Sequence, residues 1–399
     1  MYSTVVVSDR GADRVLGGHP WIYRSDVAQA DAAPGDLVRV VAGNRRTLGL
    51  ALWSSTSQIA IRMIADGGAS KLPANEADER ALFRSRFEAA LQYRASLDID
   101  ATACRLVHGE ADRLPALIVD RYGDDTGDYL VVQALCQGMD RRRALLTELL
   151  LELTGARGIL ARNDPKVRTL EGLEQTVDVW AGEVPERIDV REGAARLSVD
   201  VRHGQKTGLF LDQRENHATA ARLARGRVLD AFAYHGGFAM AMAARTPERV
   251  LALDSSDAAV AAIRQHAAAN GLSNVDAREA NVFDELRELE VAGERFDTIV
   301  LDPPAFAKNK ASVPRATAGY KEINLRAIKL LAPGGHLMTC SCSHNIDEIA
   351  FLNIVTDASI DAHATMMLVE KRQQASDHPV LLAVPETLYL KCFVLRRVS

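Results

Sequence analysis

The chain has 399 residues, of which 47% are hydrophobic and 25% charged, and its formal net charge is −5. This length allows two or three domains, and no apolar run is long enough to span a membrane. The acidic balance argues mildly against a nucleic-acid partner, although a local basic face would not show in the total. Because Asp9 and Arg10 follow so closely on the start, a signal peptide is not indicated and we expect a cytoplasmic protein.

The five cysteines lie at positions 104, 136, 340, 342 and 392. Their number is odd, and no Cys-x-x-Cys pair has a second matching pair, so the spacing predicts neither a disulfide framework nor a zinc site. We expect no metal and free thiols, most of them packed as small apolar side chains.

Short strands separated by turns such as Pro34-Gly35-Asp36 occupy residues 1–70 and predict a small β-barrel, with Gly67-Gly68-Ala69-Ser70 as a linker. A helix is expected to begin near Asn75. A hairpin, an apolar helix over 144–153 that ends at Gly155, and a strand over 158–162 follow, so residues 71–185 are predicted to form a small α+β domain.

Residues 186–399 alternate between short apolar runs and helix-length segments, which is typical of a Rossmann-like α/β sheet with parallel strands. Four of these runs end in a carboxylate or its amide: Asp230, Asp254, Asn281 and Asp302. In such a sheet the carboxyl ends of the strands form the ligand edge. We therefore expect these four side chains to line one site.

The first of these runs leads into a turn that contains Tyr234, Gly236 and Gly237. A dinucleotide site requires Gly-x-Gly-x-x-Gly to hold a pyrophosphate, and Asp230 would repel one. S-adenosylmethionine has no phosphates. Asp230 would attract its amino group, and Asp254 would accept its two ribose hydroxyls. Asn281 would accept a hydrogen bond from its adenine amine.

Asp302 begins the element Asp302-Pro303-Pro304-Ala305-Phe306, which is similar to the Asp/Asn-Pro-Pro-aromatic element of nucleic-acid methyltransferases. Two prolines make a stiff turn, and Phe306 would stack on an extruded base. Carbon 5 of a pyrimidine becomes nucleophilic after a thiolate adds to carbon 6. Cys342, beyond the next strand, is the candidate nucleophile, while Cys340 is expected to be packed. His344 and Asp377-His378 are candidate proton handlers.

Several segments carry a specific resemblance, and they are Gly18–Tyr23, Arg105–Glu110, Val119–Gly123, Lys206–Asn216, Ser341–Ser343 and Leu388–Lys391. On these segments the chain resembles the RlmI-type family of class I methyltransferases, which methylate carbon 5 of a cytosine in large-subunit ribosomal RNA. The resemblance implies a PUA-like RNA-binding domain at residues 1–70, a middle domain at 71–185 and a methyltransferase domain at 186–399. It also implies a homodimer. By the same analogy Lys206, Phe210, Asp212 and Arg214 lie against the methyl donor.

Three alternatives stay open at this point. Asp-Pro-Pro-x-Phe also suits methylation of an exocyclic amine, which needs no cysteine. A non-catalytic RNA-binding or ribosome-assembly factor would retain the sheet without turnover. A small-molecule methyltransferase would make the β-rich first domain idle, so deleting residues 1–70 should separate it from an RNA enzyme.

Overall fold

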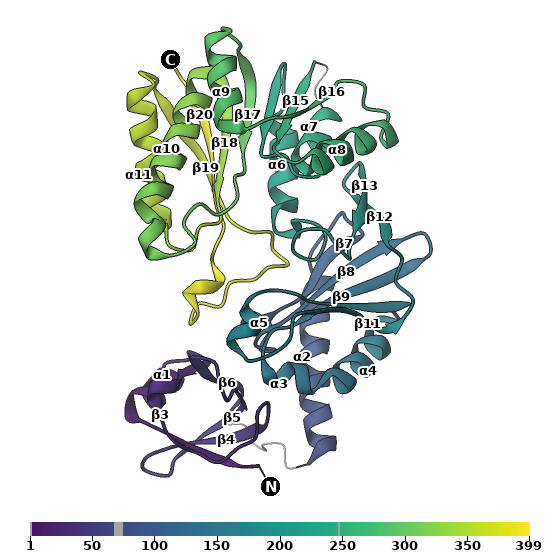
Figure 1. The fold of residues 1–399 in the computed structure, drawn as a ribbon, viewed down its shortest axis with the longest axis vertical. Helices are drawn as coiled ribbons and strands as arrows, with labels where there is room; N and C mark the ends of the chain where they lie inside the picture. Colours follow the sequence, from purple (N-terminus) through teal and green to yellow (C-terminus); the bar gives the residue numbers. More distant parts are fainter. Residues whose placement is uncertain (1, 68–74, 246–247) are drawn as a thin grey trace. The chain divides into compact units, whose positions relative to one another are not determined.

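The computed structural model describes residues 2–67, 75–245 and 248–399. The chain forms two compact units (Figure 1). Unit 1 contains the residues up to Val190 together with Val199–Leu209 and Asp377–Thr387, and unit 2 contains Arg191–Ser198, Phe210–Ser376 and Leu388–Ser399. The expected domain boundary at residues 70 and 71, and the expected linker from Gly68 onward, lie outside the described residues.

The first part of unit 1 is a six-stranded sheet in the order β2-β6-β5-β4-β1-β3. Its elements are β1 (Thr4–Val7), α1 (Asp9–Leu16), β2 (Trp21–Tyr23), η1 (Arg24–Asp26), β3 (Val27–Ala30), β4 (Leu37–Ala42), β5 (Thr47–Trp53) and β6 (Ile59–Asp66). Ser8 caps α1 by accepting a hydrogen bond from the Gly11 backbone N–H.

The second part of unit 1 is a five-stranded sheet in the order β11-β10-β9-β8-β7, packed with helices. Its elements are α2 (Glu76–Ala95), β7 (Ala103–His108), η2 (Gly109–Asp112), β8 (Leu117–Asp124), β9 (Gly127–Ala134), α3 (Gln137–Arg141), α4 (Arg143–Thr154), β10 (Gly158–Asn163), α5 (Val167–Leu170) and β11 (Thr176–Gly182). Asn75 caps α2 as expected, and Gly155 ends α4 with φ 67°. The hairpin turn is tighter than expected, because β8 and β9 extend to within two residues of each other.

Both sheets of unit 1 contribute to one hydrophobic core. Leu50, Leu52 and Ile64 of the first sheet lie in the same buried cluster as Phe83 and Phe87 of α2. Deleting residues 1–70 would therefore expose the core of the whole unit. Point substitutions on the surface are the better way to test the first domain's role.

The two later segments of unit 1, Val199–Leu209 and Asp377–Thr387, are bound to the rest of the unit by buried polar contacts. Asp377 Oδ2 accepts a hydrogen bond of 2.9 Å from the Arg105 backbone N–H. Asp120 forms a bidentate ion pair with Arg105, at 2.8 and 2.9 Å, and accepts a 2.6 Å hydrogen bond from Thr207 Oγ1. Each carboxylate is thus compensated by several donors, which is the condition for burying a charge.

The hairpin of β12 (Arg187–Glu192) and β13 (Ala195–Asp200) includes residues of both units.

Unit 2 is built on a seven-stranded sheet in the order β16-β15-β14-β17-β18-β20-β19. Its other elements, in chain order, are η3 (Leu211–Gln213), α6 (Arg214–Leu223), β14 (Val228–Ala231), α7 (Gly237–Ala243), β15 (Val250–Asp254), α8 (Asp257–Ala269), β16 (Val275–Glu279), α9 (Val282–Val291), β17 (Phe296–Leu301), η4 (Lys310–Ser312), α10 (Val313–Leu330), β18 (Leu331–Ser341), α11 (Glu348–Asp361), β19 (Met366–Arg372) and β20 (Lys391–Arg397), with η5 (Pro385–Thr387) in the segment that belongs to unit 1.

Strands β14 to β18 are parallel to one another, so their carboxyl ends meet at one edge, and β20 runs antiparallel to β18. From β14 the sheet is extended on one side by β15 and β16 and on the other side by β17 and β18, so the strand order reverses between β14 and β17. This is the switch point at which ligands bind in open α/β sheets. The predicted Rossmann-like fold is confirmed.

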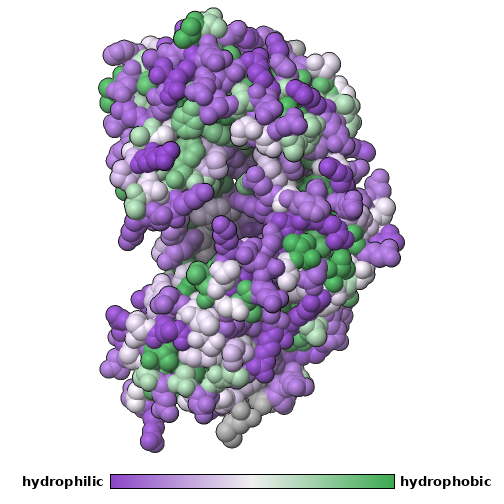
Figure 2. Space-filling model, in the orientation of Figure 1, coloured by the Kyte–Doolittle hydropathy of each residue, from purple (hydrophilic) through white to green (hydrophobic). Residues whose placement is uncertain are grey.

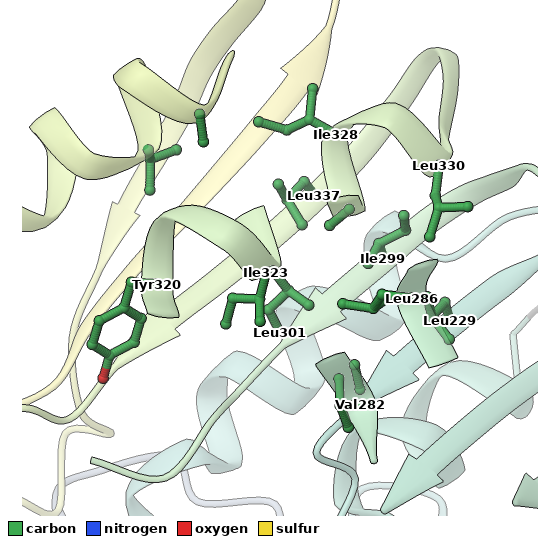
Figure 3. Packing of buried hydrophobic residues seen from close by; sticks show 14 of the residues in the cluster. Leu229, Val282, Leu286, Ile299, Leu301, Tyr320, Ile323, Ile328, Leu330 and Leu337 are labelled. Carbon is green, nitrogen blue, oxygen red and sulfur yellow. The ribbon is translucent and has the colours of Figure 1, made fainter. Parts of the chain in front are cut away.

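Alternate residues of the strands face opposite layers. Leu229, Ile299 and Leu301 point into a core shared with α9 and α10 (Figure 3). Their neighbours Val228 and Val250 are equally buried but lie outside that core. They belong to the other face, because side chains alternate along a strand. The helix before β18 begins at Val313, with Pro314 in its first turn.

The apolar side chains are gathered in these cores. In the view of Figure 2 the surface is mostly hydrophilic, with apolar side chains in small groups. None of the helices in the described ranges has both the length and the hydropathy that crossing a membrane requires.

Candidate active site

The carboxyl edge of the unit 2 sheet carries four of the predicted site residues. Asp254 ends β15, and Asp230 lies within β14. Asn281 and Asp302 lie just beyond the carboxyl ends of β16 and β17. The backbone N–H of Asp302 donates to Ala231 O at 3.3 Å, so the ends of β14 and β17 are tied together. The sequence expectation that these residues share one edge is correct.

Asp230 is the most unusual group at this edge. Its side chain is fully buried, and neither carboxylate oxygen has a hydrogen-bond partner within the described residues. Burial, with the charge of Asp302, raises the pKa of Asp230 to about 7, against the partial compensation of His217. A buried carboxylate without a partner is costly unless a cation or donor completes it.

The buried His217, whose charge acts on Asp230, pairs with the partly buried Glu192. Glu192 Oε1 lies 2.6 Å from His217 Nδ1. Burial alone would lower the pKa of His217, but the Glu192 carboxylate, with Asp302 and Asp230, raises it above its ordinary value. No motif in the sequence indicated this pair, since the partners lie on β12 and α6.

Gly237 lets α7 begin against that histidine. A Cβ at this position would lie 2.5 Å from His217 Cε1. The preceding turn contains two non-glycine residues in the left-handed region, Phe232 with φ 66° and Tyr234 with φ 48°. Such backbone costs on the order of 1 kcal/mol per residue and persists where the surrounding structure enforces it. The turn after β14 is therefore a strained and closely packed element.

Asp254 fixes this turn from the neighbouring strand. Its Oδ2 accepts a hydrogen bond of 2.8 Å from the Tyr234 backbone N–H, and its Oδ1 accepts one of 2.9 Å from Ser256 N. The Tyr234 ring stacks on the His235 ring with 3.8 Å between their centroids, and it contacts the Phe210 ring edge-on with 5.0 Å between centroids. Each carboxylate oxygen keeps a second lone pair for a ligand hydroxyl.

Two predicted ligand residues have structural contacts. Asn281 is exposed, and its Oδ1 accepts a 3.0 Å hydrogen bond from the Phe283 backbone N–H as the N-cap of α9. Gly236, with φ 83°, is the N-cap residue of α7. Both roles are compatible with ligand contact, because the amide oxygen of Asn281 has a further lone pair.

The segment before α6 divides between the units. Asp212 is buried, and its Oδ2 accepts a 2.7 Å hydrogen bond from the Tyr389 hydroxyl. Arg214 is buried at the start of α6, 3.8 Å from Glu215 Oε1. Both belong to unit 2 with Phe210, whereas Lys206 is an exposed residue of unit 1.

The two candidate cysteines differ in burial. Cys340 is fully buried in β18 opposite Cys392, and burial raises its pKa well above the ordinary value. Cys342 follows the strand and is partly exposed, with its Sγ 4.0 Å from Pro303 O. The structure thus brings the predicted nucleophile to the Asp302–Pro304 turn, and Cys340 is packed as expected.

Ser343 connects the cysteine loop to that turn. Its buried Oγ accepts a 3.0 Å hydrogen bond from Ala307 N and lies 3.0 Å from the Tyr320 hydroxyl. Its carbonyl accepts a 2.8 Å hydrogen bond from Lys391 Nζ. These contacts hold the cysteine and the proline turn in fixed register. Sequence reasoning missed them, because neither Tyr320 nor Lys391 lies near the motif in the chain.

Phe306 lies among other aromatic rings. Its ring centroid is 4.6 Å from Tyr320, 5.9 Å from Phe283 and 6.3 Å from Phe232. It is only partly buried, so part of its surface faces solvent. Pro304 beside it is exposed, whereas Pro303 is buried.

The candidate proton handlers are placed differently from one another. His344 is exposed beside Cys342. Asp377 and His378 are buried in unit 1, where His378 Nδ1 lies 3.0 Å from Asp377 Oδ1. The hydrogen bond that Asp377 accepts from the Arg105 backbone N–H gives this pair a structural role. In the described part of the chain, no group of three or more His, Cys, Asp or Glu side chains is arranged to hold a metal.

Comparison with known proteins places this geometry in a family. Residues 135–393 match the model of the S-adenosylmethionine-dependent methyltransferases, and residues 5–66 match a PUA-like domain. A solved methyltransferase, SMU.776 in complex with SAH, has the same fold, with a TM-score of 0.82 at 20% identity over 98% of this chain and 99% of that chain. A second, S-adenosylmethionine-dependent, from Streptococcus mutans has a TM-score of 0.80 at 19% identity, over the same shares of the two chains.

Relatives of similar length are more alike in sequence. A protein of Aeromonas salmonicida named ribosomal RNA large subunit methyltransferase I is 38% identical over 96% of both chains. Proteins of the same name from Aeromonas hydrophila and Shewanella denitrificans are each 39% identical, over 96% and 95% of both chains respectively. The chain therefore belongs to the S-adenosylmethionine-dependent methyltransferases, in the family of the ribosomal RNA large subunit methyltransferase I proteins.

Proposed function

We propose that this methyltransferase forms 5-methylcytosine in large-subunit ribosomal RNA, with Cys342 as a covalent nucleophile. The observation that carries the proposal is the position of Cys342, partly exposed at the end of β18 and 4.0 Å from the carbonyl of Pro303. The relatives' name supplies the class of RNA. Carbon-5 chemistry is the reaction that makes use of a thiol at this position.

The residues of the sheet edge fit S-adenosylmethionine. Asp230 presents two buried oxygens without partners among the described residues, which suits a cationic amino group. Asp254 would bind the ribose hydroxyls and Asn281 the adenine amine, with Tyr234 and Gly236 forming the turn around them. When bound, the cofactor supplies an electrophilic methyl group at this edge.

Phe210, Asp212, Arg214 and Lys206 complete the proposed donor site by family analogy. Three of them lie on the unit 2 segment that leads into α6, and Asp212 is held by the Tyr389 hydroxyl. Lys206 lies in unit 1, and its role is carried by the analogy alone.

The cytosine side of the site is built from the proline turn. Asp302 would accept hydrogen bonds from the amine edge of a flipped cytosine, while Pro303, Pro304 and Phe306 would contact its ring. The Cys342 thiolate adds to carbon 6, forming a carbon–sulfur bond and an enamine whose carbon 5 is nucleophilic. After carbon 5 is methylated, a base removes its proton, the 5,6 double bond re-forms and the thiolate leaves.

The other functions predict different products. Methylation of an exocyclic amine would leave Cys342 dispensable, a non-catalytic factor would bind RNA without turnover, and a small-molecule enzyme would not need the β-rich first domain. We further propose that unit 1 binds the RNA backbone, that the enzyme is a homodimer without a metal, and that it works in the cytoplasm, where ribosomal RNA is processed.

The test is to incubate the purified protein with labelled S-adenosylmethionine and undermodified large-subunit ribosomal RNA, and to identify the modified nucleoside by mass spectrometry. The proposal predicts 5-methylcytosine from the wild type and from Cys340→Ala, whose thiol is fully buried within β18. An N-methylated nucleoside would replace the proposal with the exocyclic reaction, and the absence of label would favour a non-catalytic factor.

A further inference from the structure

A basic segment follows the proline turn directly. Residues 303–321 contain no aspartate or glutamate, and Lys308, Lys310 and Arg315 are exposed within them. Across residues 2–67, 75–245 and 248–399, these three side chains make no ion pair and no side-chain hydrogen bond. Arg315 lies in α10, and basic residues further along that helix are paired: Lys321 with Asp361 at 2.8 Å and Arg326 with Glu290 at 2.6 Å.

The base of this segment is fixed to the nucleophile loop. Ala307, which precedes Lys308, donates its N–H to Ser343 Oγ at 3.0 Å, and its carbonyl lies 3.4 Å from Asn345 Nδ2. Both partners lie within three residues of Cys342. The positive side chains therefore start close to the sulfur that the reaction uses.

The segment is also internally ordered. Ser312 N donates to Asn309 Oδ1 at 3.0 Å, and Asn309 N donates to Ser312 Oγ at 3.1 Å, which is a reciprocal capping box. Pro314 then lies in the first turn of α10, whose amino end adds partial positive charge. Lys310 and Arg315 are thus displayed from a defined turn and helix start.

The basic segment contrasts with the acidic side chains at the carboxyl edge of the sheet. Asp230, Asp254, Glu279 and Asp302 all lie at or near the carboxyl ends of the strands, and each would repel a phosphate. An RNA strand that delivers a base to this edge brings one negative charge per nucleotide. Cations beside the target are needed to offset the repulsion.

We propose that Lys308, Lys310 and Arg315 bind the RNA phosphates next to the target nucleotide and so hold the flipped base at Cys342. This inference rests on the proposed function, because it requires an RNA substrate. It goes beyond that function by assigning an RNA contact to unit 2 itself. A purely solvated loop, the alternative, would have no effect on RNA use.

The experiment compares three full-length variants on undermodified large-subunit ribosomal RNA transcribed in vitro. The first is Lys308→Ala/Lys310→Ala/Arg315→Ala. The second retains the charges as Lys308→Arg/Lys310→Arg/Arg315→Lys. The third, Arg225→Ala/Arg295→Ala/Arg396→Ala, removes the same charge from exposed residues at the amino edge of the same sheet.

For the first variant we expect the KM for RNA to rise about tenfold at ~0.1 M salt. The slope of log(kcat/KM) against log salt should become shallower by about 2, since each single-strand phosphate contact contributes ~0.7. The charge-retaining variant should keep most of the affinity. S-adenosylmethionine affinity, measured by calorimetry, should be unchanged in all three.

Equal KM and equal salt slope in the first and third variants would overturn the inference while leaving RNA methylation by the wild type intact. A loss of S-adenosylmethionine affinity in the first variant would also overturn it, because the segment would then support the donor site. A wild type that leaves the RNA unmodified would overturn the proposed function, and this inference with it.

Discussion

Replacing Asp230 with asparagine should stabilise the ligand-free protein at neutral and alkaline pH and weaken donor binding. Asparagine has nearly the same shape as aspartate, but it has no charge to bury. Asp230 is fully buried, and neither of its oxygens has a hydrogen-bond partner in the described residues. The stability cost and the binding function therefore arise from one carboxylate.

The magnitude follows from the raised pKa. Asp230 titrates at about 7 in the folded protein, against an ordinary value of 3.8. Between these values the unfolded chain has released a proton that the folded chain retains, so stability falls by about 1.4 kcal/mol per pH unit. The loss reaches about 4 kcal/mol at pH 7 and stays constant above it. About 3 kcal/mol of this loss falls between pH 5 and pH 8.

The assay is urea denaturation of the wild type and Asp230→Asn at pH 5, 6, 7 and 8, with the free energies of unfolding compared pairwise. The advantage of the variant should grow by about 3 kcal/mol from pH 5 to pH 8. His217 also loses its stabilising contribution as pH rises through its own raised pKa. Its largest partner, Glu192, is present in both proteins, and only the smaller contribution of Asp230 is lost in the variant, which adds to the same trend. Asp284→Asn, an exposed change on α9, is the control and should show no such trend.

S-adenosylmethionine affinity is measured by calorimetry on the same proteins. Loss of a buried charge partner should weaken binding at least ~30-fold in Asp230→Asn. A variant whose stability follows the same pH dependence as the wild type would refute the buried-charge argument. Unchanged donor affinity would refute the assignment of Asp230 to the amino group.

Three further changes test other parts of the structure. Cys342→Ala should abolish methylation and keep donor affinity within about twofold, because the thiol acts on the nucleobase alone; an active variant would rule out the covalent route. Gly237→Ala, measured by thermal unfolding, should lower the free energy of unfolding by about 1–3 kcal/mol, since its methyl group would overlap the His217 ring. Gly43→Ala has nothing within 4 Å of the new methyl group and should change the free energy of unfolding little. Asp120→Ala leaves the mostly buried Arg105 without its bidentate partner and should cost about 3–5 kcal/mol in urea denaturation. Asp66→Ala breaks an exposed pair and should cost under about 1 kcal/mol, and equal losses would contradict this ranking.

The sheet and its functional edge were predictable because the signals are local. The run Ile299–Leu301 is apolar, as expected for a strand buried on both faces, and Asp302 follows it. Asn75 and Ser256 are N-caps that can be recognised from residue type and position.

The parts that escaped prediction depend on long-range contacts. His217 gains its raised pKa from Glu192, which lies on a different element. The sequence predicts the Asp377-His378 segment as a candidate proton handler, and the structure shows the Asp377 carboxylate bound to Arg105 N in unit 1, 272 positions earlier in the chain. Such pairings follow from the topology, and no local spacing encodes them.

The most direct test of the central claim is to trap the bond between the enzyme and its substrate. Fluorine at carbon 5 cannot leave as a proton does, so RNA that contains 5-fluorocytosine should stall after methylation. With S-adenosylmethionine present, we predict a stable protein–RNA adduct on a denaturing gel, with peptide mass spectrometry locating it at Cys342 and no adduct in Cys342→Ala. Production of 5-methylcytosine from normal RNA without any adduct on the fluorinated RNA would contradict the account.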